Sequence, residues 1–218
     1  MTSANHRIHA ELHKLTDLPP WGRAQGNHWD ALSRFVYRAE TLAGVRQQAN
    51  RAAAANRLDM AAFEAYAIRR WYNFHTHNQI LRMILAHPDV TPEQNRKHHT
   101  IDFYWRGLPF DLKISRFPRA YPRPFEFARQ QPHHLAQWQY QNQSKQGRYH
   151  TGNRFFIILH HAAQPERVWQ IRRDFRMIYS RLKQFLDAPT LLGLTLQSHA
   201  SAEIARPWAA VLFCTAGE

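Results

Sequence analysis

Residues 100–115 constrain the fold of this chain more than any other stretch, because apolar and polar side chains alternate on both sides of a glycine. The apolar positions are Ile101, Phe103, Trp105, Phe110, Leu112 and Ile114. A period of two is typical of β-strands. Arg106-Gly107 fits a two-residue turn, because glycine adopts positive φ without steric cost. The stretch therefore predicts a β-hairpin.

The two-residue turn fixes which residues of the hairpin face each other. Trp105 then pairs with Leu108, and each step back along the first strand is matched by one step forward along the second. Hydrogen-bonded and non-bonded pairs alternate, which puts Pro109 at a non-bonded position where its missing N–H costs nothing. Asp102 faces Asp111 at the next non-bonded pair. Like charges directly opposite destabilise a sheet unless something neutralises them, so we expect a cation there.

A divalent metal ion is the cation that best fits two opposed carboxylates. Hard cations such as Mg²⁺ are held by one or two carboxylates together with waters and substrate phosphates. We therefore expect Asp102 and Asp111 to bind Mg²⁺, with Mn²⁺ as a substitute. Lys113 follows Asp111 by two residues and lies on the same face of the strand, where its ammonium points toward the same pocket. The alternative is an exposed hairpin with these charges on its solvated face.

At these residues the chain resembles the PD-(D/E)xK nuclease superfamily, in which an acid on one strand is followed by an acid-x-lysine motif on the next. Here those residues are Asp102 and Asp111-Leu112-Lys113, and the resemblance extends over about residues 59–161. It implies a restriction-endonuclease-like core in which the carbonyl of Leu112 adds a metal ligand. It also implies that Glu64, on the preceding helix, completes the metal shell. Otherwise Glu64 is a boundary residue paired with Arg69 or with solvent.

The resemblance implies a metal-dependent nuclease that hydrolyses phosphodiester bonds, with DNA as the favoured substrate. Lys113 would orient or deprotonate the attacking water and offset charge in the transition state. Two alternatives stay open. One is a non-catalytic nucleic-acid-binding protein on the same fold, and the other is an RNA-directed nuclease such as a toxin.

The charge balance indicates a polyanionic partner. Lys and Arg number 29 against 16 Asp and Glu, which gives a net charge of +13 and a pI near 10.6. Such an excess favours nucleic acid. From Lys113 to Arg154 there are eight basic residues and one acid, Glu126. The residues expected to contact nucleic acid are Arg116, Arg119, Arg123, Arg129, Lys145 and Arg148.

Other functional classes find little support in the sequence. The longest apolar run, residues 208–214, is too short to span a membrane, and the polar start lacks the apolar core of a signal peptide. The lone Cys214 excludes an intramolecular disulfide, and the fifteen histidines show no spacing known for a metal site. We expect a cytoplasmic protein without a membrane segment, and a homodimer is left open.

The pattern of elements predicts an α/β fold: a mixed central β-sheet flanked by helices, preceded by an N-terminal helical extension. The predicted boundary places the extension in residues 1–57 and the nuclease-like core in residues 58–218. Helices are expected over residues 6–17, 29–51, 59–87, 124–144 and from 174, with Pro132 able to split the fourth. Strands beyond the hairpin are expected over residues 155–159, 191–196 and 208–214, and residues 89–99 are expected to form a loop.

Overall fold

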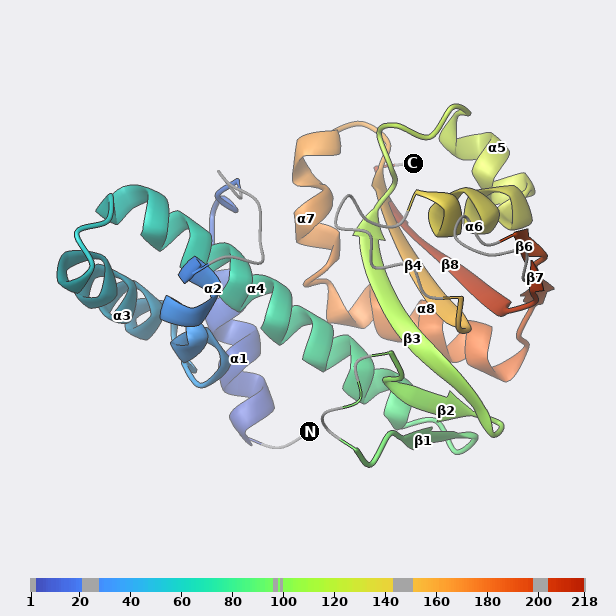
Figure 1. Cartoon of the computed structure of the whole chain (residues 1–218), viewed down its shortest axis with the longest axis horizontal. Helices are drawn as coiled ribbons and strands as arrows, with labels where there is room; N and C mark the ends of the chain where they lie inside the picture. Colours follow the sequence, from blue (N-terminus) through green and yellow to red (C-terminus); the bar gives the residue numbers. More distant parts are fainter. Residues whose placement is uncertain are drawn as a thin grey trace. The chain divides into compact units, whose positions relative to one another are not determined.

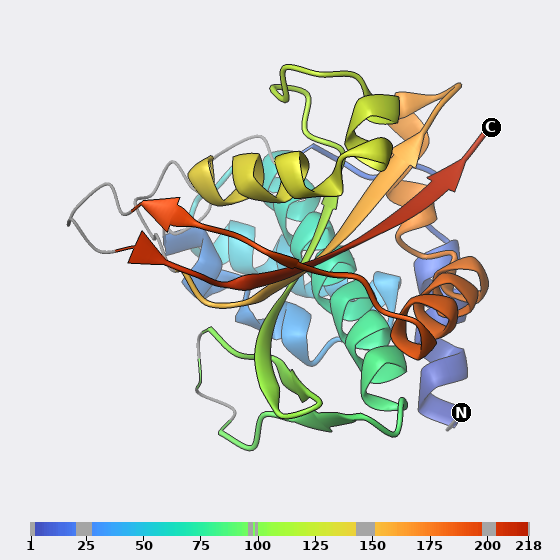
Figure 2. The same ribbon diagram turned by 90° about the vertical axis from the view of Figure 1, so that its right-hand side faces the viewer.

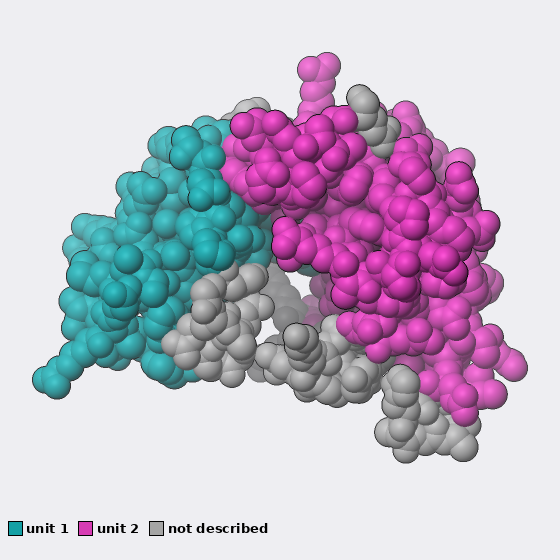
Figure 3. All heavy atoms as spheres, turned by 90° about the horizontal axis from the view of Figure 1, so that it is seen from above, with its two compact units in different colours: residues 1–79 teal, residues 80–218 magenta. Residues whose placement is uncertain are grey.

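The computed structural model divides the chain into two compact units, residues 1–79 and 80–218 (Figures 1 and 3). This division falls inside one long helix, α4 (Met60–Leu85), whereas the sequence placed the boundary after residue 57. No helix among the described residues is long and apolar enough to cross a membrane. The structure describes residues 3–20, 28–95, 98, 100–142, 151–197 and 204–217.

The first unit is helical, as predicted, but its second helix is broken. The elements before α4 are α1 (Ser3–His13), α2 (His28–Leu32), the 3-10 helix η1 (Arg34–Tyr37) and α3 (Leu42–Ala55). A continuous helix over residues 29–51 is therefore wrong. Thr41 is the N-cap of α3 and accepts a hydrogen bond from the N–H of Gly44 at 3.1 Å. The buried carboxylate of Glu11 accepts a second backbone N–H, that of Leu42, at 3.0 Å.

The long helix α4 begins where the sequence predicts. Asp59 caps it by accepting a hydrogen bond from the N–H of Ala62 at 2.7 Å. Aspartate is among the best residues at this position, because its side chain satisfies a backbone donor that has no partner within the helix. The helix ends at Leu85, before Pro88, which cannot continue it.

The second unit is built on a six-stranded mixed sheet, which confirms the predicted α/β class. The inner pairs β3–β4 and β4–β8 are parallel, and the outer pairs are antiparallel. A separate two-stranded sheet joins β6 (Leu196–Gln197) to β7 (Ile204–Ala205). In their order across the main sheet the strands are β1 (Val90–Pro92), β2 (Phe103–Trp105), β3 (Leu108–Arg116), β4 (Arg154–His161), β8 (Trp208–Ala216) and β5 (Leu191–Gly193).

Helices cover both faces of this sheet (Figure 2). Phe156 and Ile158 of β4 share a buried cluster with Leu135 and Tyr140 of α6 (Pro132–Gln141), which follows α5 (Phe125–Gln130). On the other face, Phe155 stacks on Phe185 of α8 (Phe175–Asp187) with ring centroids 5.3 Å apart. The short helix α7 (Val168–Ile171) precedes α8. The continuous apolar run of β4 reflects burial on both faces, as predicted.

Three segments qualify the sequence prediction. The helix expected over residues 124–144 is split between Gln130 and Pro132, as the sequence allowed, because proline occupies a first-turn position and starts a new helix. The single strand expected over residues 191–196 is wrong, since β5 and β6 divide it between two sheets. Residues 89–99 were expected to be a loop, but they contain β1, an edge strand paired with β2 whose Val90 is buried. Three residues are too few to show the alternation that identifies a strand in sequence.

The β2–β3 hairpin has the predicted register. Trp105 pairs with Leu108, Tyr104 with Pro109 and Phe103 with Phe110. The turn residues Arg106 and Gly107 have φ of 49° and 79°, the signs required by a type I′ turn. This turn therefore sets which residues of β3 lie beside those that precede β2.

We predict that Gly107→Ala lowers the free energy of unfolding by about 1 kcal/mol, because a side chain at positive φ is strained. The change in stability measures backbone strain alone, because a Cβ added at Gly107 meets no atom within 4 Å. Urea denaturation measures the change. Arg106→Asn is the control and should stay within about 0.5 kcal/mol of the original protein, because asparagine tolerates positive φ and the Arg106–Asp89 ion pair is exposed. Equal stability of Gly107→Ala would contradict this role of the turn.

Candidate active site

Two carboxylates meet where the β2–β3 ladder ends. The N–H of Asp102 donates to the carbonyl of Phe110 at 2.8 Å, and the Oδ2 atom of Asp102 accepts the N–H of Leu112 at 2.7 Å. The last ladder pair is Phe103 with Phe110, so the predicted backbone pair of Asp102 with Asp111 is not formed, and the Asp102 side chain bonds the Leu112 N–H instead. Asp111 begins the parallel pairing of β3 with β4. Both acids therefore lie at the start of the parallel part of the sheet.

The electrostatics of Asp102 show how close the two carboxyl groups are. Burial raises the pKa of Asp102 above its ordinary value, and the charge of Asp111 and a hydrogen bond with its carboxyl raise it further. The hydrogen bond from the Leu112 N–H and the charge of Lys113 act in the opposite direction. The net increase is the response expected of a partly buried carboxyl group beside a second carboxyl group.

Lys113 contacts Asp111 of the acid pair, on the face of β3 that the period of two predicts. Its Nζ atom is 2.8 Å from the Oδ1 atom of Asp111, whose side chain is 6% exposed. The lysine side chain is 46% exposed, so Lys113 is accessible to solvent although it contacts a buried carboxylate. Lys113 neutralises part of the charge that the opposed acids bring together.

Arg154 is a second cation at Asp111, and sequence reasoning did not place it in the site. Its Nε atom is 3.6 Å from the Oδ2 atom of Asp111, and its side chain is 4% exposed. The guanidinium lies over the ring of Tyr140, 4.7 Å from the centroid. Burial lowers the pKa of Arg154 from its ordinary value, against the opposing effects of Tyr140 and Asp111. The available signal was its position directly before the buried run Phe155–Leu159.

The donor set at the acid pair fits a hard divalent cation. Besides two carboxylates, the carbonyl of Leu112 faces the Asp102 side of β3, because the N–H and C=O of one strand residue point to the same neighbour. Among the described residues, no group of three or more His, Cys, Asp or Glu comes together. The protein would thus supply two carboxylates, and waters and phosphate oxygens the rest, which is the usual pattern for Mg²⁺.

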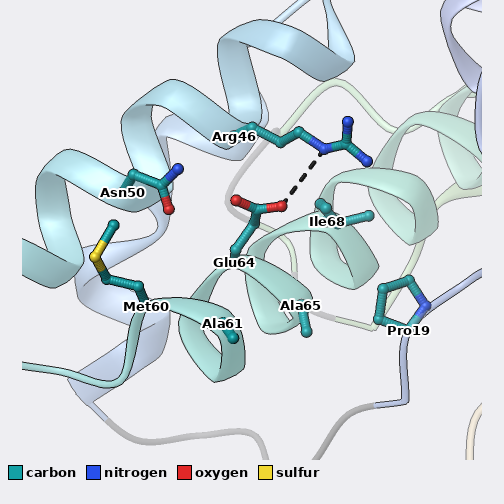
Figure 4. Close-up of a pocket in the computed structure, with 8 residues that line it drawn as sticks. All are labelled: Pro19, Arg46, Asn50, Met60, Ala61, Glu64, Ala65 and Ile68. Atoms are coloured by element: carbon teal, nitrogen blue, oxygen red, sulfur yellow. Dashed lines mark ion pairs between the residues drawn. The ribbon is translucent and has the colours of Figure 1, made fainter.

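Glu64 lies in the first unit, and its contact there is with Arg46, not with the predicted Arg69 (Figure 4). Its Oε1 atom is 3.5 Å from the Nε atom of Arg46. Arg69 instead donates to the carbonyls of Pro19 and Leu18, at 2.6 and 3.3 Å. Glu64 also lines a hollow of about 420 Å³ together with other residues of α3 and α4. Its part in a metal shell stays a prediction.

The basic residues expected to contact nucleic acid lie in two places. Arg116, Arg119 and Arg123 are exposed around a hollow at the C-terminal end of β3, five residues or roughly 17 Å along the strand from Asp111. Arg129 is also exposed and pairs with Glu126 at 3.8 Å. Lys145 and Arg148 lie outside the described residues. The role of all six in binding stays a prediction.

We predict that Arg154→Met lowers the free energy of unfolding by about 3 kcal/mol, the lower end of the range for breaking a buried ion pair, because Lys113 still contacts Asp111. In an Asp111→Asn background the same change should be nearly neutral, since the methionine then replaces a buried cation that has lost its anion. Urea denaturation of the four proteins gives the coupling energy, which is the difference between the two backgrounds and is expected to be about 3 kcal/mol.

A matched cycle on the exposed pair Lys183–Asp187, whose charged atoms are 2.9 Å apart, serves as the control. Its coupling energy should stay below about 0.5 kcal/mol, as is usual for exposed pairs one helical turn apart. Additive effects of Arg154→Met and Asp111→Asn would show that the two residues do not act as a pair.

Comparisons with known proteins do not assign this chain to a family. A scan against protein-family models, a search of curated proteins and a search of solved structures each gave no significant match. The resemblance to the PD-(D/E)xK superfamily therefore depends on Asp102, Asp111 and Lys113 themselves, and what it implies about activity is a matter of proposal.

Proposed function

We propose that this protein is a metal-dependent nuclease that hydrolyses phosphodiester bonds in DNA. The observation that carries the proposal is the arrangement of two adjacent carboxyl groups, that of Asp111 buried and that of Asp102 partly buried, with the Nζ atom of Lys113 2.8 Å from Asp111. Two carboxylates and a lysine at the end of the β2–β3 ladder provide metal ligands and a group able to move a proton. The net charge of +13 favours a polyanionic substrate.

Each residue of the site would have a different role in hydrolysis. Mg²⁺ held by Asp102, Asp111 and the Leu112 carbonyl would supply Lewis acidity and lower the pKa of a bound water. Lys113 is half exposed and can leave Asp111 for a phosphate oxygen or the attacking water. Arg154 is buried and stays beside Asp111, so the carboxylate keeps a cation when Lys113 moves.

A second candidate function is a nucleic-acid-binding protein without catalysis. The observation that favours it is the pairing of Asp111 with both Lys113 and Arg154, which balances its charge without a metal. A plasmid-nicking assay with Mg²⁺, with Mn²⁺ and with EDTA separates the two functions. Cleavage that EDTA abolishes supports the nuclease, whereas metal-independent binding without cleavage supports the alternative. An RNA substrate in parallel distinguishes DNA from RNA cleavage.

We predict that Asp111→Asn reduces plasmid nicking to background while leaving DNA binding equal or tighter. The change removes a metal ligand and a negative charge near the phosphate, but it keeps the size of the side chain. Nicking and electrophoretic mobility shift, both at fixed salt, measure the two properties. Asp187→Asn removes a comparable Asp–Lys contact on α8 and should leave both unchanged. Full nicking by Asp111→Asn would exclude a metal site at this residue.

We predict that Lys113→Ala lowers the turnover number by about 10²- to 10⁴-fold, the usual contribution of a group that transfers a proton. Divalent-metal affinity should be unchanged or higher, because lysine is no ligand and its ammonium competes for Asp111. Lys113→Arg should not restore the rate, since the planar guanidinium cannot act as a base. Single-turnover cleavage and calorimetric metal titration separate the two effects. Lys183→Ala is the control, and wild-type turnover by Lys113→Ala would contradict the assignment.

A further inference from the structure

A basic hollow lies at the opposite end of β3 and β4 from the acid pair. Its volume is about 280 Å³, and its lining comes from two connections, residues 116–123 after β3 and residues 159–168 at the end of β4. Asp111 pairs with the first residue of β4, whereas the hollow surrounds the last residues of both strands. The hollow and the acid pair are therefore separate places on the second unit.

The topology of the sheet opens a crevice at this end. β3 and β4 are parallel neighbours, but the chain leaves them toward opposite faces. After β3 it enters α5 and α6, which cover one face, and after β4 it enters α7 and α8, of which α8 covers the other (Figure 2). Adjacent parallel strands whose connections diverge in this way leave a crevice outside their carboxyl ends, where α/β proteins commonly bind ligands.

The lining combines cationic and aromatic side chains. Arg116, Arg119 and Arg123 are exposed at its rim, and none of the described lining residues is acidic. Arginine matches phosphate oxygens through its planar set of donors. Phe117 and His160 supply ring surfaces, and the His160 ring is held parallel to Phe125 at a centroid distance of 3.8 Å. Rings beside cations suit a ligand that carries both a phosphate and an aromatic base.

We propose that this hollow binds a nucleotide, with its phosphate at Arg116 and Arg119 and its base against the aromatic lining. The ligand is a free nucleotide or the terminal nucleotide of a single strand, since both present the same chemistry. The inference goes beyond the proposed nuclease site, because it does not require the acid pair to bind a metal or to be catalytic.

The test is calorimetric titration of the full chain, without divalent metal, with a deoxynucleoside 5′-monophosphate. The mononucleotide should bind more tightly than inorganic phosphate or the unphosphorylated nucleoside, because it alone engages both parts of the hollow. Arg116→Gln with Arg119→Gln should weaken binding at least about 10-fold, as expected for the loss of a charge-assisted hydrogen bond. A short 5′-phosphorylated oligodeoxynucleotide that displaces the mononucleotide assigns the hollow to a strand end, and failure to displace it assigns the hollow to a free nucleotide.

The matched control is Arg176→Gln with Arg181→Gln, which removes two exposed arginines from α8. Its net charge therefore equals that of the double variant in the hollow. It should change the affinity less than about 2-fold, because it removes charge without a contact. An equal loss in both double variants, or inorganic phosphate binding as tightly as the mononucleotide, would overturn the proposal. Plasmid nicking is measured in parallel and tests the nuclease proposal separately. Binding of the mononucleotide without DNA cleavage would support the nucleotide site and contradict the nuclease proposal.

Discussion

The two-residue turn at Arg106 and Gly107 is the constraint on which the candidate site depends. Its positive φ angles join β2 and β3 in one register, and that register brings Asp102 against the Leu112 N–H. A slip of one residue would turn the side chains of Asp111 and Lys113 to the opposite face of the sheet. A feature of backbone conformation therefore decides which charged side chains lie close together.

Two cations make the pairing of acids tolerable, and they differ in accessibility. Arg154 is 4% exposed and stacked on Tyr140, so its position is fixed by packing. Lys113 is 46% exposed on a flexible stem, so it can exchange Asp111 for another anion. Burying a charge is costly unless it is paired. The fixed cation keeps Asp111 paired, so under the proposed function the accessible one would be available for substrate.

How much the sequence revealed depends on the range of the interactions. The hairpin register and the Asp59 cap were predictable, because a turn and a cap are determined by residues close in sequence. Arg154 was not, since it reaches Asp111 through a parallel pairing that follows two intervening helices. The break before α3 was missed although its cap, Thr41, is local, because the apolar period runs across the break; the second acceptor, the carboxylate of Glu11 that bonds the Leu42 N–H, is distant in sequence.

The local balance of charge is compatible with the anionic substrate of the proposed function. Two carboxylates alone would repel a phosphate, but Lys113 and Arg154 lie beside Asp111 and offset its charge, and the protein as a whole carries +13. Burial and the charge of Asp111 raise the pKa of Asp102, the direction expected for two carboxyl groups that lie close together. Under the proposed function, the acid pair would supply oxygen donors for a divalent cation while the net positive charge would still attract a phosphate backbone. Acids placed alone on a neutral surface could not do both.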